Sequence, residues 1–366
     1  MADKALENFI ENVCGDSHLR VEADLGDGFV RLRSAEAERR QAVHDIRSTE
    51  DVVIELLRNA RDANARSIFV AATREERRRR IVMVDDGDGI PPAMHERIFE
   101  PRVTSKLDTM HMDKWGVHGR GMALYSIAVN AETARIAASD VGKGSAFVVE
   151  TDLDRIGEKT DQSTFPIFER MESGSVAVRG PKNILRTACE FALESRRSCT
   201  VYLGSATDIT ATLYEFGLSS LTSAMRAFCA DTTRLPVCTR LAAAPDPAEL
   251  ADESAKLGLA ISERSARRIM DGGIAPLEPL LARVRIGEEG EEKPHPARIL
   301  SEASPSADAD QRGLKLSQDD LAAFSDRIRA AYAELARDYY LEPEVRPEVR
   351  VGKDAIRISI PVQKLR

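Results

Sequence analysis

The clearest hydrophobic pattern in the chain lies between residues 50 and 65. Apolar side chains recur there at helical spacing, at Val53, Leu56, Leu57, Ala60 and Ala63. Ser48 and Asp51 precede the run in the arrangement of a capping box. At about 100° per residue, three polar residues share a narrow face turned largely away from the leucines, namely Glu55, Asn59 and Asp62. The sequence therefore predicts a capped helix whose polar face is either solvated or part of a site.

Two short apolar runs after this helix predict strands. They cover residues 68–72 and 81–84, and we expect the basic residues 77–80 to form a charged turn between them. The second run leads directly into Asp85, and glycines follow at Gly87 and Gly89. Glycine lets the backbone approach a flat ligand, and a strand-end carboxylate can accept a hydrogen bond from an exocyclic amine such as that of adenine. A plain Asp-Gly turn is the alternative interpretation.

A glycine-rich stretch then precedes a run of apolar residues without a helix breaker. Its glycines are Gly116, Gly119 and Gly121, and the run covers residues 122–129. Free amides at such a helix start suit phosphate, although a glycine hinge before a buried helix would give the same pattern. The stretch has neither the strand, turn and helix of a Rossmann unit nor the Gly-Lys-Ser/Thr of a P-loop.

Taken in order, these segments resemble the motifs of the GHKL superfamily. Its members are type II topoisomerase ATPase subunits, ninety-kilodalton heat-shock chaperones, histidine kinases and MutL mismatch-repair proteins. The resemblance covers about residues 35–153 and rests on six stretches, 55–63, 85–91, 98–101, 104–106, 116–121 and 144–147. Each stretch alone is a weak signal, and their order is a strong one. The resemblance implies a Bergerat-type α/β sandwich, in which a mixed sheet carries helices on one face and ATP lies between the helices and a mobile lid.

The resemblance also implies a role for each matching residue at the nucleoside and metal end of the site. Asn59 would ligate Mg²⁺, and Asp85 would bind the adenine amine. Gly87 and Gly89 would line the base pocket. Glu55 matches the general base that aligns the attacking water in the ATPase branches.

At the phosphate end, the same resemblance assigns the phosphates to three glycines, Gly116, Gly119 and Gly121. Ser145 matches the residue that often hydrogen-bonds through water to the adenine aspartate. Thr104 and Lys106 match a lid, where a cation near the terminal phosphates offsets developing charge. Lys106 and Glu55 are thus the candidate catalytic residues.

The branch within the superfamily stays open, because the motifs are mixed. Residues 98–101 and 144–149 resemble histidine kinases, whereas Glu55 and residues 104–106 resemble MutL. A histidine kinase also needs a phosphoacceptor histidine on a dimerising helical hairpin, and His44 lies only eleven residues before Glu55. That distance is too short for the hairpin, so we interpret His44 as a surface histidine.

Composition narrows the class of protein. The 366 residues are 43% hydrophobic and carry a net charge of −8, which argues against broad nonspecific adhesion to nucleic acid. No segment approaches ~18 uninterrupted apolar residues, and the N-terminus lacks a signal-peptide pattern, so we expect a cytoplasmic protein without a membrane partner. The five cysteines form no Cys-x-x-Cys pair and are expected to be reduced thiols.

The remaining sequence is divided by composition. Residues 1–34 form an N-terminal extension before the ATP-binding domain at 35–153. Residues 154–286 suggest a second α+β domain, for which a transducer-like domain is one interpretation, with helices at 183–194 and 219–230 and a strand at 199–203. Lys182 is a weak candidate for a lysine that this domain sends into the ATP site. Residues 251–269 are similar to a helix-turn-helix motif, although we favour an ordinary pair of helices. Residues 287–313 read as a flexible linker, and 314–366 as a C-terminal helix and β-hairpin.

We therefore predict that the chain has an α+β fold. We also predict that it binds ATP with Mg²⁺ and hydrolyses the ATP slowly. Lid closure would act as a conformational or dimerisation switch, with a homodimer on ATP binding or an unknown protein as partner. Two alternatives remain. One is a histidine-kinase-like phosphotransferase acting on a partner protein, and the other is a nucleotide-responsive DNA-binding regulator using Arg264, Arg267 and Arg268.

Overall fold

The computed structural model divides the chain into two compact units, Met1–Lys293 and Pro294–Arg366. The residues that the structure describes are 21–33, 36–105, 111–113, 116–118, 121–170, 176–229, 231–284, 286–288, 318–338, 342–343, 348–351 and 356–360. Within these ranges, no helix combines the length and apolar character needed to cross a membrane.

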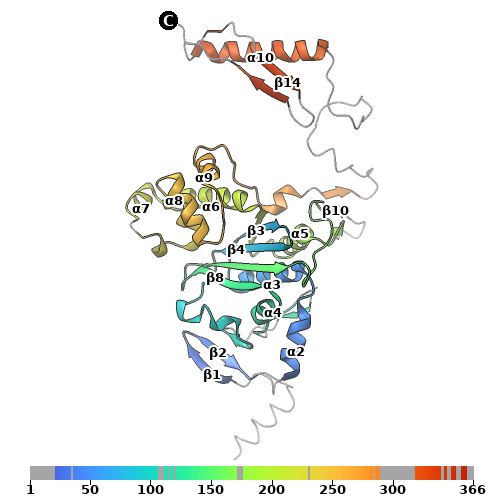
Figure 1. Ribbon diagram of the computed structural model, residues 1–366, viewed down its shortest axis with the longest axis vertical. Helices are drawn as coiled ribbons and strands as arrows, with labels where there is room; N and C mark the ends of the chain where they lie inside the picture. Colours follow the sequence, from blue (N-terminus) through green and yellow to red (C-terminus); the bar gives the residue numbers. More distant parts are fainter. Residues whose placement is uncertain are drawn as a thin grey trace, which may run out of the picture. The chain divides into compact units, whose positions relative to one another are not determined.

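A mixed five-stranded sheet is the centre of the first unit (Figure 1). Its order is β12-β3-β4-β9-β8, with bounds Thr200–Gly204, Ser67–Glu75, Arg78–Asp85, Ser145–Asp152 and Thr133–Ser139. The last four are antiparallel neighbours, whereas β12 runs parallel to β3. The two strands predicted before Asp85 are confirmed as β3 and β4, and the sheet is mixed as the resemblance implied.

Helices on one face of this sheet position the site. They are α2 (Glu36–Asp45), α3 (Thr49–Asp62), α4 (Ala123–Asn130) and α5 (Ile184–Glu194). Helix α3 starts at the predicted capping box, in which Ser48 and Asp51 bond each other's backbone N–H groups. Val53 and Leu57 of α3 are fully buried in the core with Ile81 and Met83 of β4. The apolar stripe of the predicted helix therefore faces the sheet.

The other face of the sheet is also covered, by residues C-terminal to the strands. Val82 and Val84 of β4 belong to a second core, which includes residues of α6 (Ala206–Ser220), η4 (Val237–Ala243), α8 (Pro247–Lys256) and α9 (Glu263–Met270). Phe69 of β3 stacks on Tyr202 with ring centroids 4.9 Å apart. Burial on both faces explains the continuous apolar run of β4, because an alternating strand would leave one face solvated.

A separate second domain at 154–286 is not confirmed, because β12 lies within that range and belongs to the central sheet. Helix α5 and strand β12 lie where a helix and a strand were predicted. Helix α6 was not predicted, and the helix expected at 219–230 is reduced to α7 (Ser223–Ala227). The segment 251–269 forms the pair α8 and α9, whose connection packs on the sheet at Val148.

The prediction that the basic residues 77–80 form a turn is wrong for three of the four. Arg78, Arg79 and Arg80 lie in β4, and only Arg77 is in the turn after β3. Their guanidinium groups pair with acids of other segments: Arg78 with Glu132 at 2.7 Å, Arg79 with Glu158 at 2.7 Å and Arg80 with Glu150 at 2.5 Å. Arg79 is only 7% exposed. These residues link the sheet to its neighbours instead of forming a free basic patch.

Smaller sheets surround this centre. Strands β1 (Val21–Gly26), β2 (Phe29–Leu32) and β5 (Val103–Thr104) form one, in the order β1-β2-β5. A second small sheet consists of β10 (Ile167–Arg170), β11 (Val176–Arg179) and β13 (Ile286–Glu288). A third consists of β6 (His111–Asp113) and β7 (Gly116–His118). The short helices are η1 (Pro92–Met94), η2 (Arg97–Phe99), η3 (Thr232–Arg234) and η5 (Leu280–Arg283).

The second unit has a helix and a hairpin at the predicted positions. Helix α10 spans Gln318–Asp338, and β14 (Glu348–Val351) pairs antiparallel with β15 (Ile356–Ser359). Tyr332 and Ala336 of α10 are buried together, with Ile360 packed against them. Tyr332 of this helix is therefore a core side chain of the second unit.

The turn between α8 and α9 should be sensitive to a single methyl group. Gly258 has φ +90° and lies where a Cβ would overlap the Val148 side chain, whereas Gly272 has φ +71° and no heavy atom within 4 Å of that position. Gly258→Ala should therefore lower the free energy of unfolding by about 1–3 kcal/mol more than Gly272→Ala, which carries the backbone strain alone. Urea unfolding of both variants measures the difference. Equal losses would show that the turn does not pack on the sheet.

Candidate functional site

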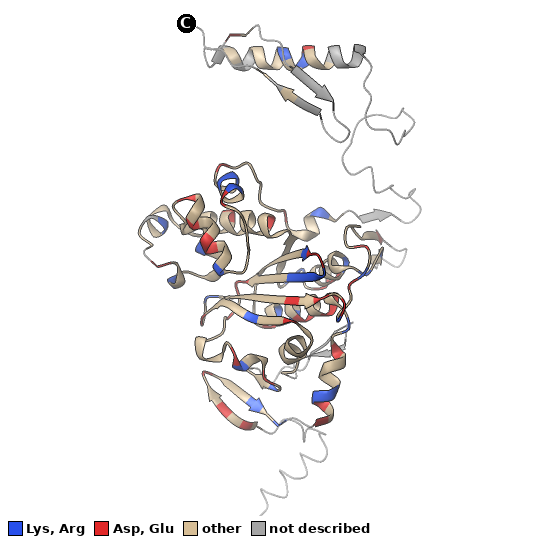
Figure 2. Cartoon of the chain, in the orientation of Figure 1, with Lys and Arg blue, Asp and Glu red and all other residues tan. Residues whose placement is uncertain are grey.

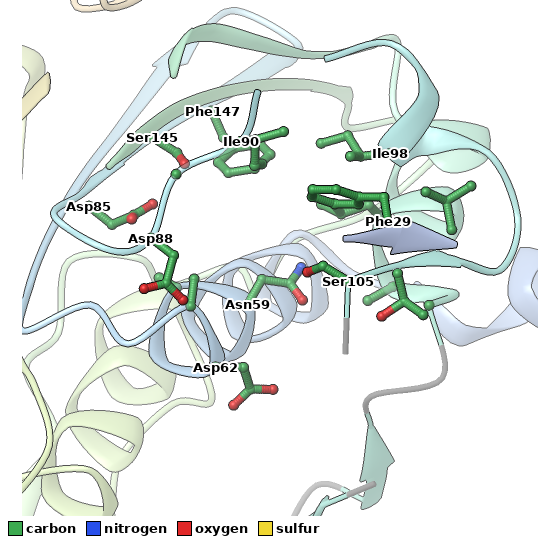
Figure 3. A pocket seen from close by; sticks show the side chains of 18 residues that line it. Phe29, Asn59, Asp62, Asp85, Asp88, Ile90, Ile98, Ser105, Ser145 and Phe147 are labelled. Atoms are coloured by element: carbon green, nitrogen blue, oxygen red, sulfur yellow. The ribbon is translucent and has the colours of Figure 1, made fainter. Parts of the chain in front are cut away.

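A cavity opens between α3, the loop after β4, strand β9 and the start of the predicted lid (Figure 3). Six of the predicted site residues line it, namely Asn59, Asp85, Gly89, Thr104, Gly121 and Ser145. Other lining residues are apolar, among them Phe29, Ile90, Ile98 and Phe147. The cavity thus combines an apolar wall with a few polar groups, as small-molecule sites do.

Asp85 is held at one end of this cavity. It is the last residue of β4, is 2% exposed, and lies directly opposite Ser145 in the antiparallel register of β4 and β9. The Gly87 N–H donates to Asp85 Oδ1 at 2.9 Å. That bond fixes the orientation of the carboxylate before any ligand enters.

The Ser145 hydroxyl belongs to a small buried network. Ser139 Oγ donates to the Gly144 carbonyl at 2.9 Å and accepts from the Ile90 N–H at 2.8 Å. Ser139 Oγ also lies 3.1 Å from Ser145 Oγ. Because the single hydroxyl proton of Ser139 is used on Gly144, Ser145 is the donor of this last bond and keeps its lone pairs for another partner.

Two glycines let the loop after β4 approach the β8–β9 turn. Gly89 and Gly144 have φ values of +73° and +78°, and a Cβ on them would overlap the carbonyl oxygens of Asp140 and Asp85 respectively. Gly87 was predicted to line the base pocket, but it is not among the residues that line this cavity. A Cβ there would lie 2.5 Å from the Ala63 carbonyl oxygen, so its place is against the end of α3. These glycines shape the pocket through close packing of backbone.

Further hydrogen bonds tie the same loop to its surroundings. Asp86 Oδ1 accepts from the N–H groups of Arg66 at 2.7 Å and Ser67 at 2.8 Å. The Asp88 N–H donates to the Ala63 carbonyl at 2.8 Å. The loop after Asp85 is therefore fixed to the end of α3 and the start of β3 by hydrogen bonds to their main-chain groups.

Asn59 lies on α3, on the side of the cavity that this helix forms and apart from Asp85 (Figure 3). Its Nδ2 is buried and has no hydrogen-bond partner among the described residues. The two ends of a side-chain amide are assigned from their partners, so this amide can present its oxygen to a cation. Asp62, three residues further on, also lines the cavity. Oxygen donors of this kind fit Mg²⁺, which keeps several waters and takes few protein ligands.

Glu55 does not join Asn59 and Asp62 in the cavity lining. Its Oε1 lies 2.5 Å from Nη1 of Arg58, whose side chain is 4% exposed. The predicted polar face of α3 is thus divided between a cavity side and an ion pair. The role of Glu55 as a base stays a prediction.

The two ends of the lid meet at the cavity. Thr104 and Gly121 both line it, and the Arg102 N–H donates to the Gly121 carbonyl at 2.9 Å. Gly121 precedes α4, so the first turn of that helix faces the cavity through Ala123 and Leu124. Gly116 lies in the short strand β7. The predicted residues Lys106 and Gly119 lie outside the described residues.

Phe29 is a site residue that sequence analysis missed. It is 9% exposed and lines the cavity from β2, which pairs with β5 so that Val30 faces Thr104. We placed this segment in an N-terminal extension outside the ATP-binding domain. The signal was present, because Gly26-Asp27-Gly28 is a turn sequence between two runs of strand-forming residues.

Charges behind the cavity hold the β8–β9 turn. Lys143 Nζ donates to Asp140 Oδ2 at 2.8 Å, and this hydrogen bond, together with one from the Val141 N–H, lowers the pKa of Asp140. The Val237 N–H donates to the Lys143 carbonyl at 2.8 Å. The neighbouring Cys238 is buried, and burial raises the pKa of its thiol well above the usual value. Cys238 is therefore an inert core residue.

Three other candidates lie elsewhere. His44 is exposed near the end of α2, as expected for a surface histidine, and Lys182 is exposed and does not line the cavity. The three arginines of α9, a helix coloured partly blue for its basic residues in Figure 2, are exposed, and Arg267 pairs with Glu263 of the same helix at 3.0 Å.

Comparison with known proteins gives one family. Residues 44–155 match the model described as Histidine kinase-, DNA gyrase B-, and HSP90-like ATPase. No curated protein matches the chain. The matched range contains Asn59, Asp85 and Ser145 and ends before β12.

A pair of neighbouring glycines tests the packing of this site. A Cβ at Gly144 would overlap the carbonyl of Asp85, whereas Gly142 has φ +71° and open space at the same position. Gly144→Ala should displace Asp85 and weaken ATP binding by about tenfold or more, since a misplaced charged hydrogen bond costs about 1.5–3 kcal/mol. Gly142→Ala should retain affinity within about threefold, because it adds only local backbone strain. Calorimetric titration with Mg²⁺-ATP measures the affinity of each variant. Equal affinities of the two variants would show that packing at Gly144 does not affect the ATP site.

Proposed function

We propose that this chain, whose residues 44–155 form an ATPase domain of the GHKL superfamily, is a Mg²⁺-dependent ATP-binding protein that hydrolyses ATP slowly. Closure of the lid over the triphosphate would change its contacts with other parts of the chain or with a partner. The observation that carries the proposal is one cavity lined by both a buried carboxylate, Asp85, and the side-chain amide of Asn59, whose Nδ2 has no partner among the described residues.

The nucleoside end favours adenine. Asp85 offers an acceptor to the exocyclic amine, and Ser145 on the neighbouring strand can support it through water. Guanine presents a carbonyl oxygen at the same position, which a carboxylate repels. The apolar side chains of Ile98 and Phe147 line the wall on which a flat base can pack.

The phosphate end would be organised by α3, α4 and the lid. Asn59 and Asp62 supply oxygen atoms for Mg²⁺, which when bound offsets the negative charge of the phosphate oxygens. Gly121 and the first turn of α4 supply backbone N–H groups that suit an anion. Thr104, at the start of the lid, lines the same end.

Hydrolysis would use Glu55 to orient and deprotonate the attacking water. Glu55 lies one helical turn before Asn59 on α3, but its carboxylate is paired with Arg58. The carboxylate must therefore rearrange or be shared with the guanidinium before it can contact water at the γ-phosphate. Such a step is consistent with slow turnover. The ATP-dependent homodimer and the unknown protein partner stay predictions.

Asp85→Asn tests binding. The amide would place a donor or a neutral oxygen opposite the adenine amine, and loss of the charged hydrogen bond should weaken Mg²⁺-ATP binding by about tenfold or more. Asp252→Asn, an acid paired with Lys256 at the surface, is the matched control and should leave the affinity unchanged. Unchanged calorimetric affinity of Asp85→Asn would remove this residue from the site and with it the adenine assignment.

Glu55→Gln tests turnover separately from binding. The glutamine keeps the size of the side chain but cannot accept a proton, so hydrolysis should fall by about 100-fold or more while ATP affinity stays within about threefold. Glu132→Gln, which alters a surface pair with Arg78, is the control. The rate of phosphate release under saturating Mg²⁺-ATP measures the hydrolysis by each variant. Wild-type turnover in Glu55→Gln would contradict the ATPase mechanism, and phosphate found on a partner's histidine would point to a kinase.

A further inference from the structure

The cavity contains another carboxylate that neither the adenine contact nor the metal contact uses. Asp88 lines the cavity, and in Figure 3 its side chain stands between those of Asp85 and Asn59. Its N–H donates to the Ala63 carbonyl at 2.8 Å, and its carbonyl accepts from the Gly142 N–H at 2.6 Å. The backbone of Asp88 is therefore restrained on both sides.

One carboxylate oxygen of Asp88 is also held. Asn64 Nδ2 donates to Asp88 Oδ2 at 2.7 Å. Asn64 has φ +60°, the left-handed conformation in which asparagine often follows a helix, so the end of α3 fixes the position of this donor. The second oxygen, Oδ1, has no partner among the described residues. The structure thus presents an oriented, charged acceptor on the cavity wall.

Asp62 is not equivalent to Asp88, although it lines the same cavity. Its Oδ1 accepts from Arg61 Nε at 3.1 Å, so a neighbouring cation already compensates its charge. Asp62 also lies one turn from Asn59, at the end assigned to the metal. Asp88 instead lies three residues after Asp85, in the loop that follows β4.

The chemistry of a nucleotide limits what can meet Asp88. A carboxylate repels phosphate oxygens, and the donors of an adenine nucleotide are the base amine and the ribose hydroxyls. The amine is assigned to Asp85, and the ribose joins the base to the phosphates. A group placed between the base end and the metal end of the cavity therefore faces the sugar.

We propose that Asp88 accepts a hydrogen bond from a ribose hydroxyl and makes the site selective for ribonucleotides over deoxynucleotides. The inference rests on the proposed ATP-binding function and assigns the sugar specificity of the same cavity. A carboxylate that accepts from a ribose diol also disfavours a phosphate on that hydroxyl, because the two charges repel.

The experiment compares Mg²⁺ complexes of ATP, 2′-deoxy-ATP and 3′-deoxy-ATP by calorimetry on the full chain. At least one deoxynucleotide should bind the wild type about tenfold more weakly than ATP, since the charged acceptor of Asp88 then has no ribose donor. Asp88→Ala should lower ATP affinity by about the same factor and bring the ratio between the nucleotides to within about twofold of one. Asp154→Ala removes an exposed carboxylate beside Arg77 and should keep the wild-type ratio.

A second variant guards against a folding defect in Asp88→Ala. Asp88→Asn can still accept from Asn64 and has the same shape, but it offers the cavity a neutral donor, so the nucleotide ratio should fall toward one in this variant too. Equal wild-type affinity for all three nucleotides would overturn the sugar assignment and leave ATP binding intact. Equal weakening of all three in both variants would overturn it in favour of a structural or metal-binding role. No binding of ATP to the wild type would overturn both the proposed function and this inference.

Discussion

The antiparallel register of β4 and β9 is the constraint on which the site depends. It places Asp85 opposite Ser145, so that the carboxylate and the hydroxyl network enter one end of the cavity from adjacent strands. A shift of one residue in either strand would turn the site side chain of that strand to the opposite face. The register is secured by burial on both faces, since Ile81 and Met83 fill one core while Val82 and Val84 fill the other. The chemistry at the strand end is therefore fixed by packing along the whole strand.

The end of α3 connects this strand end to the metal-binding side. Asn59 lies in its last turns, the chain turns at Asn64 with φ +60°, and the loop carrying Asp88 bonds to Ala63 and Asn64. A single helix terminus thus sets the distance between the two ends of the cavity. The backbone bond to Ala63 fixes the main chain of this loop, and the side-chain bond from Asn64 fixes the carboxylate of Asp88.

Local patterns predicted the parts of the site that lie within one element. The capping box at Ser48, the strand leading into Asp85 and the cavity position of Asn59 follow from periodicity and motif order. Pairings between distant segments did not follow, because nothing in the residues of β2 specifies β5 as its neighbour. The parallel pairing of β12 with β3 was missed for the same reason. The ion pair of Glu55 with Arg58 was missed although the two residues are only three apart in α3, because we grouped Glu55 by helix face with Asn59 and Asp62. Helix α6 was obscured by Thr210, Thr212 and Gly217, which are weak helix formers, although Ser205 and Asp208 form its capping box.

The helical layer on the second face of the sheet reaches the back of the cavity through the β8–β9 turn. Gly142 bonds to Asp88 on the cavity side, while the next residue, Lys143, bonds to Thr233 and accepts from Val237 on the other side. Gly144 leaves no room for even a methyl group against Asp85. Close-packed backbone of this kind transmits a displacement instead of absorbing it. Movement of the loop on nucleotide binding would therefore have to be accommodated by this turn, by the η4 segment behind it, or by both.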